Sequence, residues 1–397
     1  MSRRRYFSLM ALSGALACSD DDPTMIIPDS GPAPDAGLVS DFGVEPDLGV
    51  VDTGVIVDLG TPDLGPDDLG TVDVGTPDAG PLDMGDAGTG TVSAGIWAAG
   101  VNLSGGEFGS GVGTLERTYT YPRLSHAQSF LDAGFSAYRI PFKWERIQRE
   151  RMGPLYATDL ARLNGLTRDL TAEGAIVILD VHNYARGFGS HIGTDTSSAA
   201  FADLWRRLAE EFKDEQRVWF GIMNEPSGIS AANWLPSANA AIAAIRATGA
   251  TNMILVPGVR WTGAHSWYSG GEDSNANVMV GVVDPGDNFA FEVHQYLDSD
   301  SSGTHFDVDC VSPTVGESRV TRVTEWARMH GYRLFLGEFA GVDMPVCQTA
   351  IDGMLRYMRN SSDVWIGYTW WAAGPWWPSS YGFRLPGPQE QWLLPYR

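Results

Sequence analysis

Eight short apolar runs, each about as long as a β-strand, alternate with longer amphipathic runs from Gly95 to the end of the 397-residue chain. Alternation of this kind is typical of βα units whose strands pair in parallel. Eight parallel strands in about 300 residues favour an α/β fold of the TIM (β/α)8 barrel type over an open, doubly wound sheet. The strands are expected at Ile96–Leu103, Ala137–Phe142, Ile176–His182, Val218–Asn224, Met253–Pro257, Phe289–Tyr296, Leu334–Phe339 and Val364–Trp371.

The amphipathic runs between these strands predict the outer helices of the barrel. The run after the fifth strand is irregular, so its helix should be short or missing, and the tail after the eighth strand has room for only a stub. We therefore assign residues 94–397 to one barrel domain. Its longer helices are expected at Leu160–Glu173, Ala200–Phe212, Ala231–Ala247, Val320–His330 and Thr349–Met358.

The segment before the barrel, residues 19–93, has a different composition. It contains 17 Asp and Glu residues and no Lys or Arg, among Gly, Pro, Thr and small apolar residues in loose Thr-Pro-Asp-x-Gly repeats. Such a segment cannot bury enough apolar surface to offset the entropy of ordering it, so we expect a disordered acidic tether. Its Asp residues lack the spacing of a calcium loop.

The charge of the chain argues against nucleic acid as a partner. Without the tether and three arginines near the N-terminus, the formal charge falls from −22 to −8. Neither part of the chain therefore supplies the basic surface that phosphate binding requires.

Residues 1–18 resemble a lipoprotein signal peptide. Arg3 to Arg5 precede an apolar stretch that is too short to span a bilayer, and Leu16-Ala17-Cys18 resembles a bacterial lipobox. Cleavage before Cys18 and a lipid on its sulfur would attach an exported protein to the membrane, at the cell surface or outer membrane, unless it is released from the cell. An ordinary signal peptide is the alternative. With Cys18 lipidated, Cys310 and Cys347 are left to pair in an oxidising compartment.

Polar and aromatic residues close six of the predicted strands. The carboxyl ends of barrel strands form the active face, so these residues should meet at one rim. Polar groups at the ends of apolar strands are costly to desolvate without a purpose. Two carboxylic acids with stacking aromatics are what cleavage of a glycosidic bond requires. The six strand ends are Tyr138–Phe142, Asp180–Tyr184, Met223–Pro226, Phe291–Tyr296, Leu336–Phe339 and Tyr368–Trp371.

No competing chemistry is equally represented in the sequence. There is no glycine-rich phosphate loop, no His-Glu-x-x-His and no Gly-x-Ser-x-Gly. The loop from Asp298 to Gly303, followed by Asp309, superficially has a calcium-loop spacing but lacks the bidentate Glu. We therefore expect neither a cofactor nor a metal.

Five stretches of the barrel carry a more specific signal: Gly100–Gly109, Asp180–Arg186, Val218–Pro226, His294–Asp300 and Gly337–Phe339. Together they resemble the fungal and bacterial endoglucanases of glycoside hydrolase family 5, over essentially all of residues 95–397. The resemblance implies that Glu225 is the acid/base, that Glu338 is the nucleophile, that anomeric configuration is retained and that Cys310 bonds to Cys347. It also implies active-site positions for Arg139, His182, Asn224, His294, Tyr296 and Trp371.

The two glutamates need different environments. Glu338 must be ionised to attack, and Arg139 and Tyr296 are suited to stabilise its negative charge. Glu225 must start protonated, and the neighbouring charge of Glu338 favours that state. Asn224 is placed to bond the sugar 2-hydroxyl, an interaction that strengthens in the transition state.

The remaining candidates would orient the carboxylates or hold the sugar. His182 and His294 are interpreted as orienting the carboxylates, with a packing role as the alternative for either, and Asn183 is expected at the substrate. Trp205 and Trp326 lie in predicted helices and are most simply core residues. Indole faces near strand ends are expected to stack on glucosyl rings, and these are Trp261, Trp370, Trp371, Trp376 and Trp377.

The sequence therefore predicts a monomeric, retaining endo-β-1,4-glucanase acting on cellulose or a related β-glucan polysaccharide. A β-mannanase or xyloglucanase on the same barrel would share the catalytic pair, because specificity depends on the shape of the rim. A surface lectin that binds polysaccharide without cutting it is the alternative from another class. It is disfavoured by Glu225 and Glu338, since a binding module gains nothing from two carboxylates facing a sugar bond.

Overall fold

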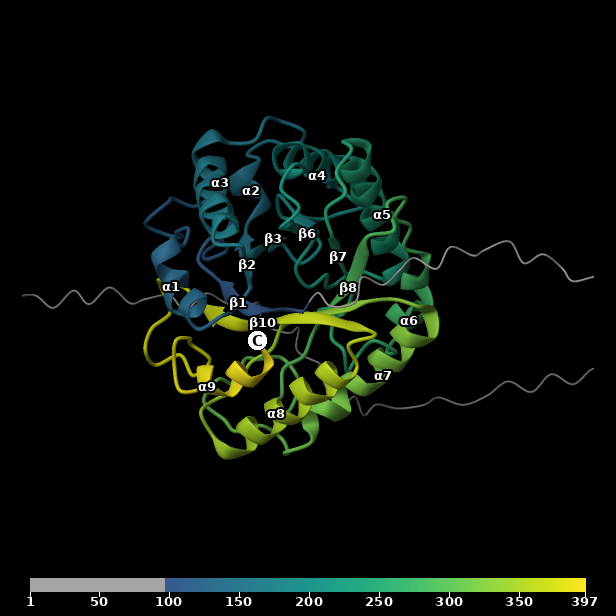
Figure 1. Cartoon of the computed structure of the whole chain (residues 1–397). Helices are drawn as coiled ribbons and strands as arrows, with labels where there is room; N and C mark the ends of the chain where they lie inside the picture. Colours follow the sequence, from purple (N-terminus) through teal and green to yellow (C-terminus); the bar gives the residue numbers. More distant parts are fainter. Residues whose placement is uncertain (1–96) are drawn as a thin grey trace, which may run out of the picture. The chain divides into compact units, whose positions relative to one another are not determined.

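Residues 97–397 are described by the computed structural model (Figure 1). Eight parallel strands close into a barrel in the order β1-β10-β9-β8-β7-β6-β3-β2, so the predicted TIM barrel is confirmed. A small antiparallel hairpin, β4 (Arg186–Gly187) and β5 (Ser190–His191), follows the third barrel strand. The barrel strands are β1 (Ala98–Leu103), β2 (Ala137–Phe142), β3 (Ile176–Val181), β6 (Val218–Gly221), β7 (Ile254–Pro257), β8 (Phe289–His294), β9 (Leu334–Glu338) and β10 (Trp365–Ala373).

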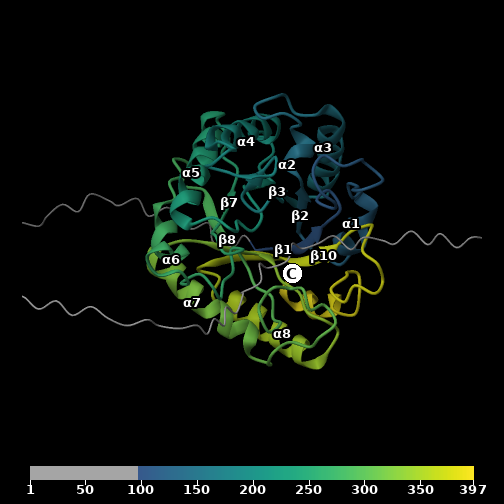
Figure 2. The ribbon, with the colours of Figure 1, turned by 180° about the vertical axis from the view of Figure 1, so that it is seen from behind.

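Helices surround this barrel, as the views from opposite sides show (Figures 1 and 2). The long ones begin and end close to the predicted ranges. They are α3 (Ala157–Ala172), α4 (Ser198–Phe212), α5 (Ala231–Ala247), α7 (Val315–His330) and α8 (Pro345–Asn360). The shorter ones are α1 (Leu124–Asp132), α2 (Trp144–Ile147), α6 (Asn275–Val278) and α9 (Glu390–Leu393), with single 3-10 turns at Gly271–Asp273, Met279–Gly281 and Leu394–Tyr396.

Two irregularities of the sequence pattern have their expected counterparts. The segment after β7 forms only α6 and two 3-10 turns, and the tail after β10 ends in the short α9. Three elements fall outside the predicted ranges: α1, α2 and the β4–β5 hairpin. Helix α2 is a single turn and each hairpin strand has two residues, lengths at which a hydrophobic period is not readable.

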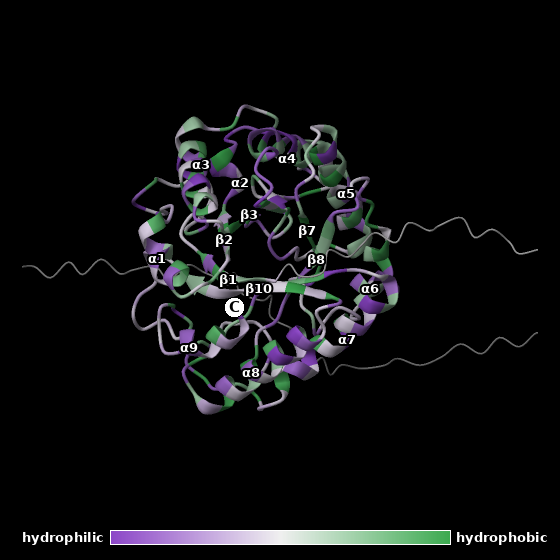
Figure 3. Cartoon of the chain, in the orientation of Figure 1, coloured by the Kyte–Doolittle hydropathy of each residue, from purple (hydrophilic) through white to green (hydrophobic). Residues whose placement is uncertain are grey.

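Apolar side chains fill two separate regions of the fold. The larger core packs the barrel strands against the outer helices. The smaller one gathers Ala98, Ala137, Ile178, Trp219, Met253, Leu255, Ala290, Phe335 and Ile366. Residues two apart on a strand point to the same face. Asp180 and Glu292 therefore lie on the same side of the sheet as Ile178 and Ala290 of this smaller core. Helices α7 and α8 carry both hydrophilic and hydrophobic segments in Figure 3, as expected for helices that cover a barrel.

The predicted disulfide between Cys310 and Cys347 is present. The tether at residues 19–93, the signal peptide at residues 1–18 and the lipid on Cys18 lie outside the described residues. Within residues 97–397, no helix has the length and apolar character to cross a membrane.

Candidate active site

Glu225 and Glu338 reach the same end of the barrel from different strands. Glu338 is the last residue of β9, and Glu225 lies in the turn that follows β6. Glu225 has a φ of 43°, in the left-handed region that costs a residue with a side chain about 1–3 kcal/mol. The turn is held from both sides, because Tyr184 N–H donates to Asn224 O at 3.0 Å and Trp261 N–H donates to Pro226 O at 3.2 Å. Neighbouring loops thus fix the direction of the Glu225 side chain.

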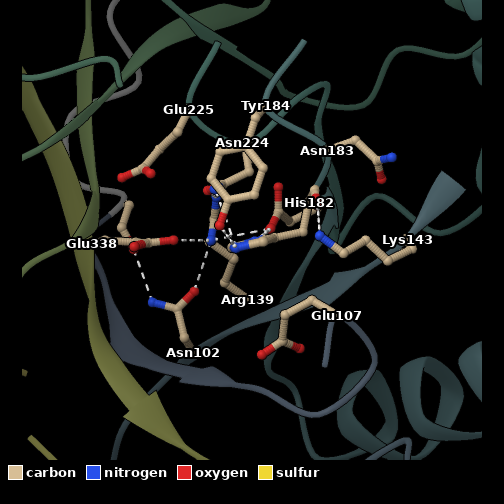
Figure 4. A network of polar contacts seen from close by, with 12 residues as sticks. Asn102, Glu107, Arg139, Lys143, His182, Asn183, Tyr184, Asn224, Glu225 and Glu338 are labelled. Carbon is tan, nitrogen blue, oxygen red and sulfur yellow. Dashed lines mark hydrogen bonds and ion pairs between the residues drawn. The ribbon is translucent and has the colours of Figure 1, made fainter. Parts of the chain in front are cut away.

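Two donors hold the carboxylate of Glu338. Arg139 Nη1 donates to Oε1 at 2.9 Å, and the hydroxyl of Tyr296 donates to Oε2 at 2.8 Å (Figure 4 shows the first). Gly337 precedes Glu338, and a Cβ at Gly337 would lie 2.2 Å from Oε1 of Glu292. The lack of a side chain at Gly337 therefore leaves room for the Glu292 carboxylate. Both bonds favour the ionised form of Glu338.

His294 connects the two glutamates. Its Nδ1 lies 2.8 Å from Oε1 of Glu225 and 3.6 Å from Oε2 of Glu338, and its Nε2 lies 3.1 Å from Oε1 of the buried Glu292. One carboxylate oxygen from each catalytic candidate and one nitrogen of His294 all lie within 4.8 Å of one another. The two carboxyl groups are therefore close enough to influence each other's charge.

Arg139 is the centre of a buried ionic network. The side chain has no exposed surface and contacts three carboxylates: Asp180 at 3.2 Å, Glu292 at 2.9 Å and Glu338 at 2.9 Å. It also donates to Oδ1 of Asn224 at 2.8 Å (Figure 4). A buried guanidinium with several carboxylate partners has a fixed position, which fixes Glu338 and Asn224 in turn.

The pKa values in the site follow from burial and from these contacts. Burial raises the pKa of Glu338 to about 7, with a contribution from the charge of Glu225, although His294, Arg139 and the hydroxyl of Tyr296 oppose the rise. Burial alone would lower the pKa of His294, but Glu338, Glu225 and Glu292 raise it to about 10. The three carboxylates around His294 therefore favour its protonated form.

The other predicted site residues have different surroundings. His182 contacts neither glutamate: it bonds Asp180, Asn224 and Tyr184, and its ring stacks on Trp371 at 5.4 Å. It thus orients Asn224 rather than a catalytic carboxylate, which corrects the sequence interpretation. Oδ1 of Asn183 accepts from the backbone N–H of Trp144 and its Nδ2 donates to the carboxylate of Glu145, and the expected contact of Asn183 with substrate stays a prediction.

The tryptophans expected to stack on sugar rings differ in how much of their surface is exposed. Trp370 has no exposed surface and donates to Phe383 O at 2.8 Å, so it cannot offer a face to a sugar, and the prediction for it is wrong. Trp371 and Trp377 retain a small exposed fraction, Trp376 is half-buried, and Trp261 is 38% exposed. Trp205 and Trp326 are core residues, as predicted.

Three residues without a predicted role also contact Arg139: Asn102, Asp180 and Glu292. A signal was present for two of them. Asp180 stands two residues before His182 and Glu292 two residues before His294, the spacing that puts both members of each pair on one face of a strand.

Most of the barrel matches a known protein family. The family described as "Cellulase (glycosyl hydrolase family 5)" matches residues 100–374. The chain belongs to glycoside hydrolase family 5. It is 40% identical over 289 residues to endo-beta-1,4-glucanase B of Aspergillus niger, covering 72% of this chain and 84% of that protein. It is 42% identical over 292 residues to endo-beta-1,4-glucanase A of Emericella nidulans, covering 72% and 85%.

Solved structures of endoglucanases share the fold. An endo-beta-1,4-glucanase of Xanthomonas axonopodis pv. citri is 44% identical with a TM-score of 0.74, covering 76% of this chain and 98% of that one. The structure of XacCel5A in complex with cellopentaose is 48% identical with the same TM-score of 0.74, covering 76% and 100%. Membership of the family makes this chain a glycoside hydrolase and confirms the resemblance drawn from the sequence.

Proposed function

We propose that this chain is a retaining endo-β-1,4-glucanase that cuts internal bonds of cellulose or related β-glucans with Glu225 and Glu338. The spacing of the two carboxylates carries the proposal: an oxygen of each lies within 4.8 Å of the other and of the shared His294. Retaining glycosidases hold their carboxyl groups about 5–5.5 Å apart, whereas inverting ones need about 6.5–9.5 Å to admit a water. The separation here suits attack by a carboxylate on the sugar.

In the first step, Glu338 is the nucleophile. Its carboxylate oxygen forms a bond to the anomeric carbon while the bond from that carbon to the glycosidic oxygen breaks. Glu225 gives its proton to the departing oxygen. Arg139 and Tyr296 support this assignment, because their hydrogen bonds to Glu338 stabilise the ionised carboxylate that attacks.

In the second step, Glu225 acts as a base. The covalent bond neutralises Glu338, so Glu225 stays ionised and takes a proton from water. The water oxygen then bonds to the anomeric carbon and releases Glu338 as a carboxylate. Nδ1 of His294, 2.8 Å from Oε1 of Glu225, is in reach to donate a hydrogen bond to Glu225 in this step.

The sugar would be held by Asn224 and by indole faces. Oδ1 of Asn224 accepts from Arg139 and its Nδ2 lies 3.2 Å from Nε2 of His182, which leaves one amide hydrogen to donate to a 2-hydroxyl. Trp371 and Trp376 are the candidates for stacking after β10. Trp261, anchored beside Glu225 through Pro226, is the candidate on the leaving-group side.

The names of the relatives favour β-1,4-glucan over mannan or xyloglucan as the substrate. Carboxymethylcellulose, barley β-glucan and glucomannan, assayed side by side with the purified protein, test this. We expect hydrolysis of the first two, with a rapid fall in viscosity that marks internal cuts. A preference for glucomannan would reassign the substrate, and binding to all three without hydrolysis would favour the lectin.

We also propose that the protein is exported and carries a lipid on Cys18. The Cys310–Cys347 bond supports export, because disulfides persist in oxidising compartments. Growth with a radiolabelled fatty acid should label the wild type and not Cys18→Ser. Labelling of both, or of neither, would contradict the proposal.

A further inference from the structure

Four buried side chains form a closed cycle of polar contacts beside Glu338. Nη2 of Arg139 lies 2.8 Å from Oδ1 of Asn224, and Nδ2 of Asn224 lies 3.2 Å from Nε2 of His182 (Figure 4). Nδ1 of His182 lies 2.8 Å from Oδ2 of Asp180, which in turn lies 3.2 Å from Nη1 of Arg139. None of the four residues is more than 4% exposed. Asp180 takes part in neither of the proposed catalytic steps.

The direction of the hydrogen bonds in this cycle follows from Arg139. A guanidinium has only donors, so the amide atom that faces it must be the oxygen of Asn224. The amide nitrogen therefore faces His182, and because that nitrogen can only donate, Nε2 of His182 must be an acceptor. Burial, with the positive charges of Lys143 and Arg139, lowers the pKa of His182 well below its usual range. The imidazole is therefore neutral and has its single proton on Nδ1.

Asp180 is the acceptor that this tautomer requires. Among residues 97–397, the one hydrogen-bond partner of Nδ1 of His182 is Oδ2 of Asp180. Burial raises the pKa of Asp180, and Arg139 opposes the rise. A proton on Asp180 would belong on Oδ1, which has no partner among these residues, so Oδ2 accepts from Nδ1 in either protonation state. Without this acceptor the buried Nδ1–H would be unpaired, which favours moving the proton to Nε2.

Tyr184 does not select the tautomer, although its hydroxyl also lies 3.2 Å from Nε2 of His182. A hydroxyl can donate or accept, so Tyr184 suits a proton on either nitrogen. The amide nitrogen of Asn224 can only donate and suits only one. A proton on Nε2 would put two donors face to face and release Asn224 from its position.

We propose that Asp180 is a positioning residue, which keeps the proton of His182 on Nδ1 and thereby makes Asn224 a hydrogen-bond donor to the 2-hydroxyl of the attacked sugar. One hydrogen of the Asn224 amide is used on His182, and the other is directed to the sugar. Asp180 has no exposed surface and acts through His182 and Asn224. This inference rests on the proposed function, because it requires a β-glucan unit at Glu338.

Nitrogen-15 NMR of the imidazole tests the tautomer without any substrate. Spectra of the wild type and of His182→Gln, compared at neutral pH, identify the two signals of His182. We expect a protonated Nδ1 and an unprotonated Nε2 in the wild type. Asp180→Leu, which removes the acceptor, should move the proton to Nε2. Asp180→Asn should leave it on Nδ1, because its amide oxygen can take the place of Oδ2.

Kinetics on two substrates test the consequence for the reaction. The substrates are an aryl β-cellobioside and its analogue without the 2-hydroxyl of the attacked unit. The ratio of their kcat/KM values should fall about 10-fold in Asp180→Leu, because Asn224 no longer donates to the 2-hydroxyl in the transition state. Asp180→Asn should retain most of the ratio. Asp159→Leu, the same change at a buried carboxylate that accepts from the hydroxyl of Tyr119, should retain it fully.

The outcomes separate positioning from a merely structural role. An equal loss on both substrates in Asp180→Leu, or an unchanged ratio, would overturn the inference. Absence of hydrolysis of the aryl β-cellobioside by the wild type would instead overturn the proposed function, while NMR would still test the tautomer. If Asp180→Leu fails to fold, by melting temperature, the wild-type spectrum decides, since a proton on Nε2 of His182 would contradict the role of Asp180.

Discussion

Glu225 and Glu338 carry the same functional group, and their partners separate their roles. Glu338 accepts from Arg139 and Tyr296, whereas the side chain of Glu225 has one hydrogen-bond partner among residues 97–397, a nitrogen of His294. The carboxylate with two donors is stabilised in its ionised form, so Glu338 is assigned as the nucleophile and Glu225 as the acid. The two residues should therefore fail differently when truncated.

We predict opposite azide products from Glu225→Ala and Glu338→Ala. Without its acid, Glu225→Ala should lose about 10²–10⁴-fold on substrates with poor leaving groups, yet still form the intermediate from an activated aryl glycoside. Azide, which needs no base, should then speed turnover and give the β-glycosyl azide. Glu338→Ala forms no such intermediate, so azide should enter from the vacated face and give the α product. The same anomer from both variants, by NMR, would refute the assignment.

We predict that Tyr296→Phe shifts the pH profile. Its hydroxyl donates to ionised Glu338, whose pKa is about 7, so removing this donor should raise that pKa. The nucleophile must be ionised, and activity is lost as pH falls through its pKa. The acid limb of kcat/KM should therefore move to higher pH, by about one unit. Tyr156→Phe, at a ring that is 38% exposed, should leave the limb in place. A shift to lower pH would contradict this electrostatic account.

The sequence was sufficient to predict which residues carry the chemistry. It was insufficient to predict the direction in which some of the side chains point. Glu225, Glu338, Arg139, His294 and Tyr296 meet as predicted because the ends of barrel strands converge. Trp370 and Trp371 illustrate the limit: neighbouring strand residues point to opposite sides, and the sequence does not say which side faces the mouth. Asn183 lies one residue beyond His182, past the end of β3, where the turn rather than the strand sets its direction.

At the scale of elements, the loop after β8 and the first turn of α8, which follows β9, form one connected unit. The disulfide Cys310–Cys347 joins them, and Oδ1 of Asp309 accepts from the backbone N–H of both cysteines at 2.8 and 3.0 Å. These two segments come next in the chain after the strands that carry His294 and Glu338. The bond therefore secures the part of the rim that holds the nucleophile.

We predict that replacing both cysteines with serine lowers stability more than activity. The bond closes a loop of 37 residues, which corresponds to about 3–4 kcal/mol from the unfolded chain. For a barrel of this size the melting temperature should fall by about 5 °C. Calorimetry with and without reductant measures this. An unchanged melting temperature in the double variant would show that Asp309 and the surrounding packing hold the loops unaided.

The presence of each barrel strand was more predictable than the residues at which it begins and ends. Each of the eight strands was predictable from an apolar run, but the expected strand Val218–Asn224 leaves the ladder after Gly221. Its last residues keep a strand-like pattern while the chain turns toward Glu225, whose left-handed φ no periodicity reveals. Helix α1 has the amphipathic character of the others and follows Tyr121-Pro122, yet it falls outside the predicted ranges.

At the scale of the whole molecule, every side chain of the catalytic network belongs to residues 97–397. Deletion of residues 19–93 should therefore leave kcat/KM on soluble β-glucan unchanged within about twofold, since no reacting group is removed. Limited proteolysis should yield a stable fragment that begins near Gly95. A protected fragment that begins much earlier, or loss of activity on deletion, would show that the acidic segment is part of the folded enzyme.

The central claim is that Glu338 attacks the sugar and Glu225 serves first as acid and then as base. Two inversions at one carbon restore the original configuration, whereas direct attack by water inverts it. NMR of the first seconds of β-glucan hydrolysis by the wild-type protein distinguishes the two, before the reducing ends equilibrate. The account predicts that the β-anomer of the new reducing end appears first. Initial appearance of the α-anomer would contradict both the retaining mechanism and the roles assigned to the two glutamates.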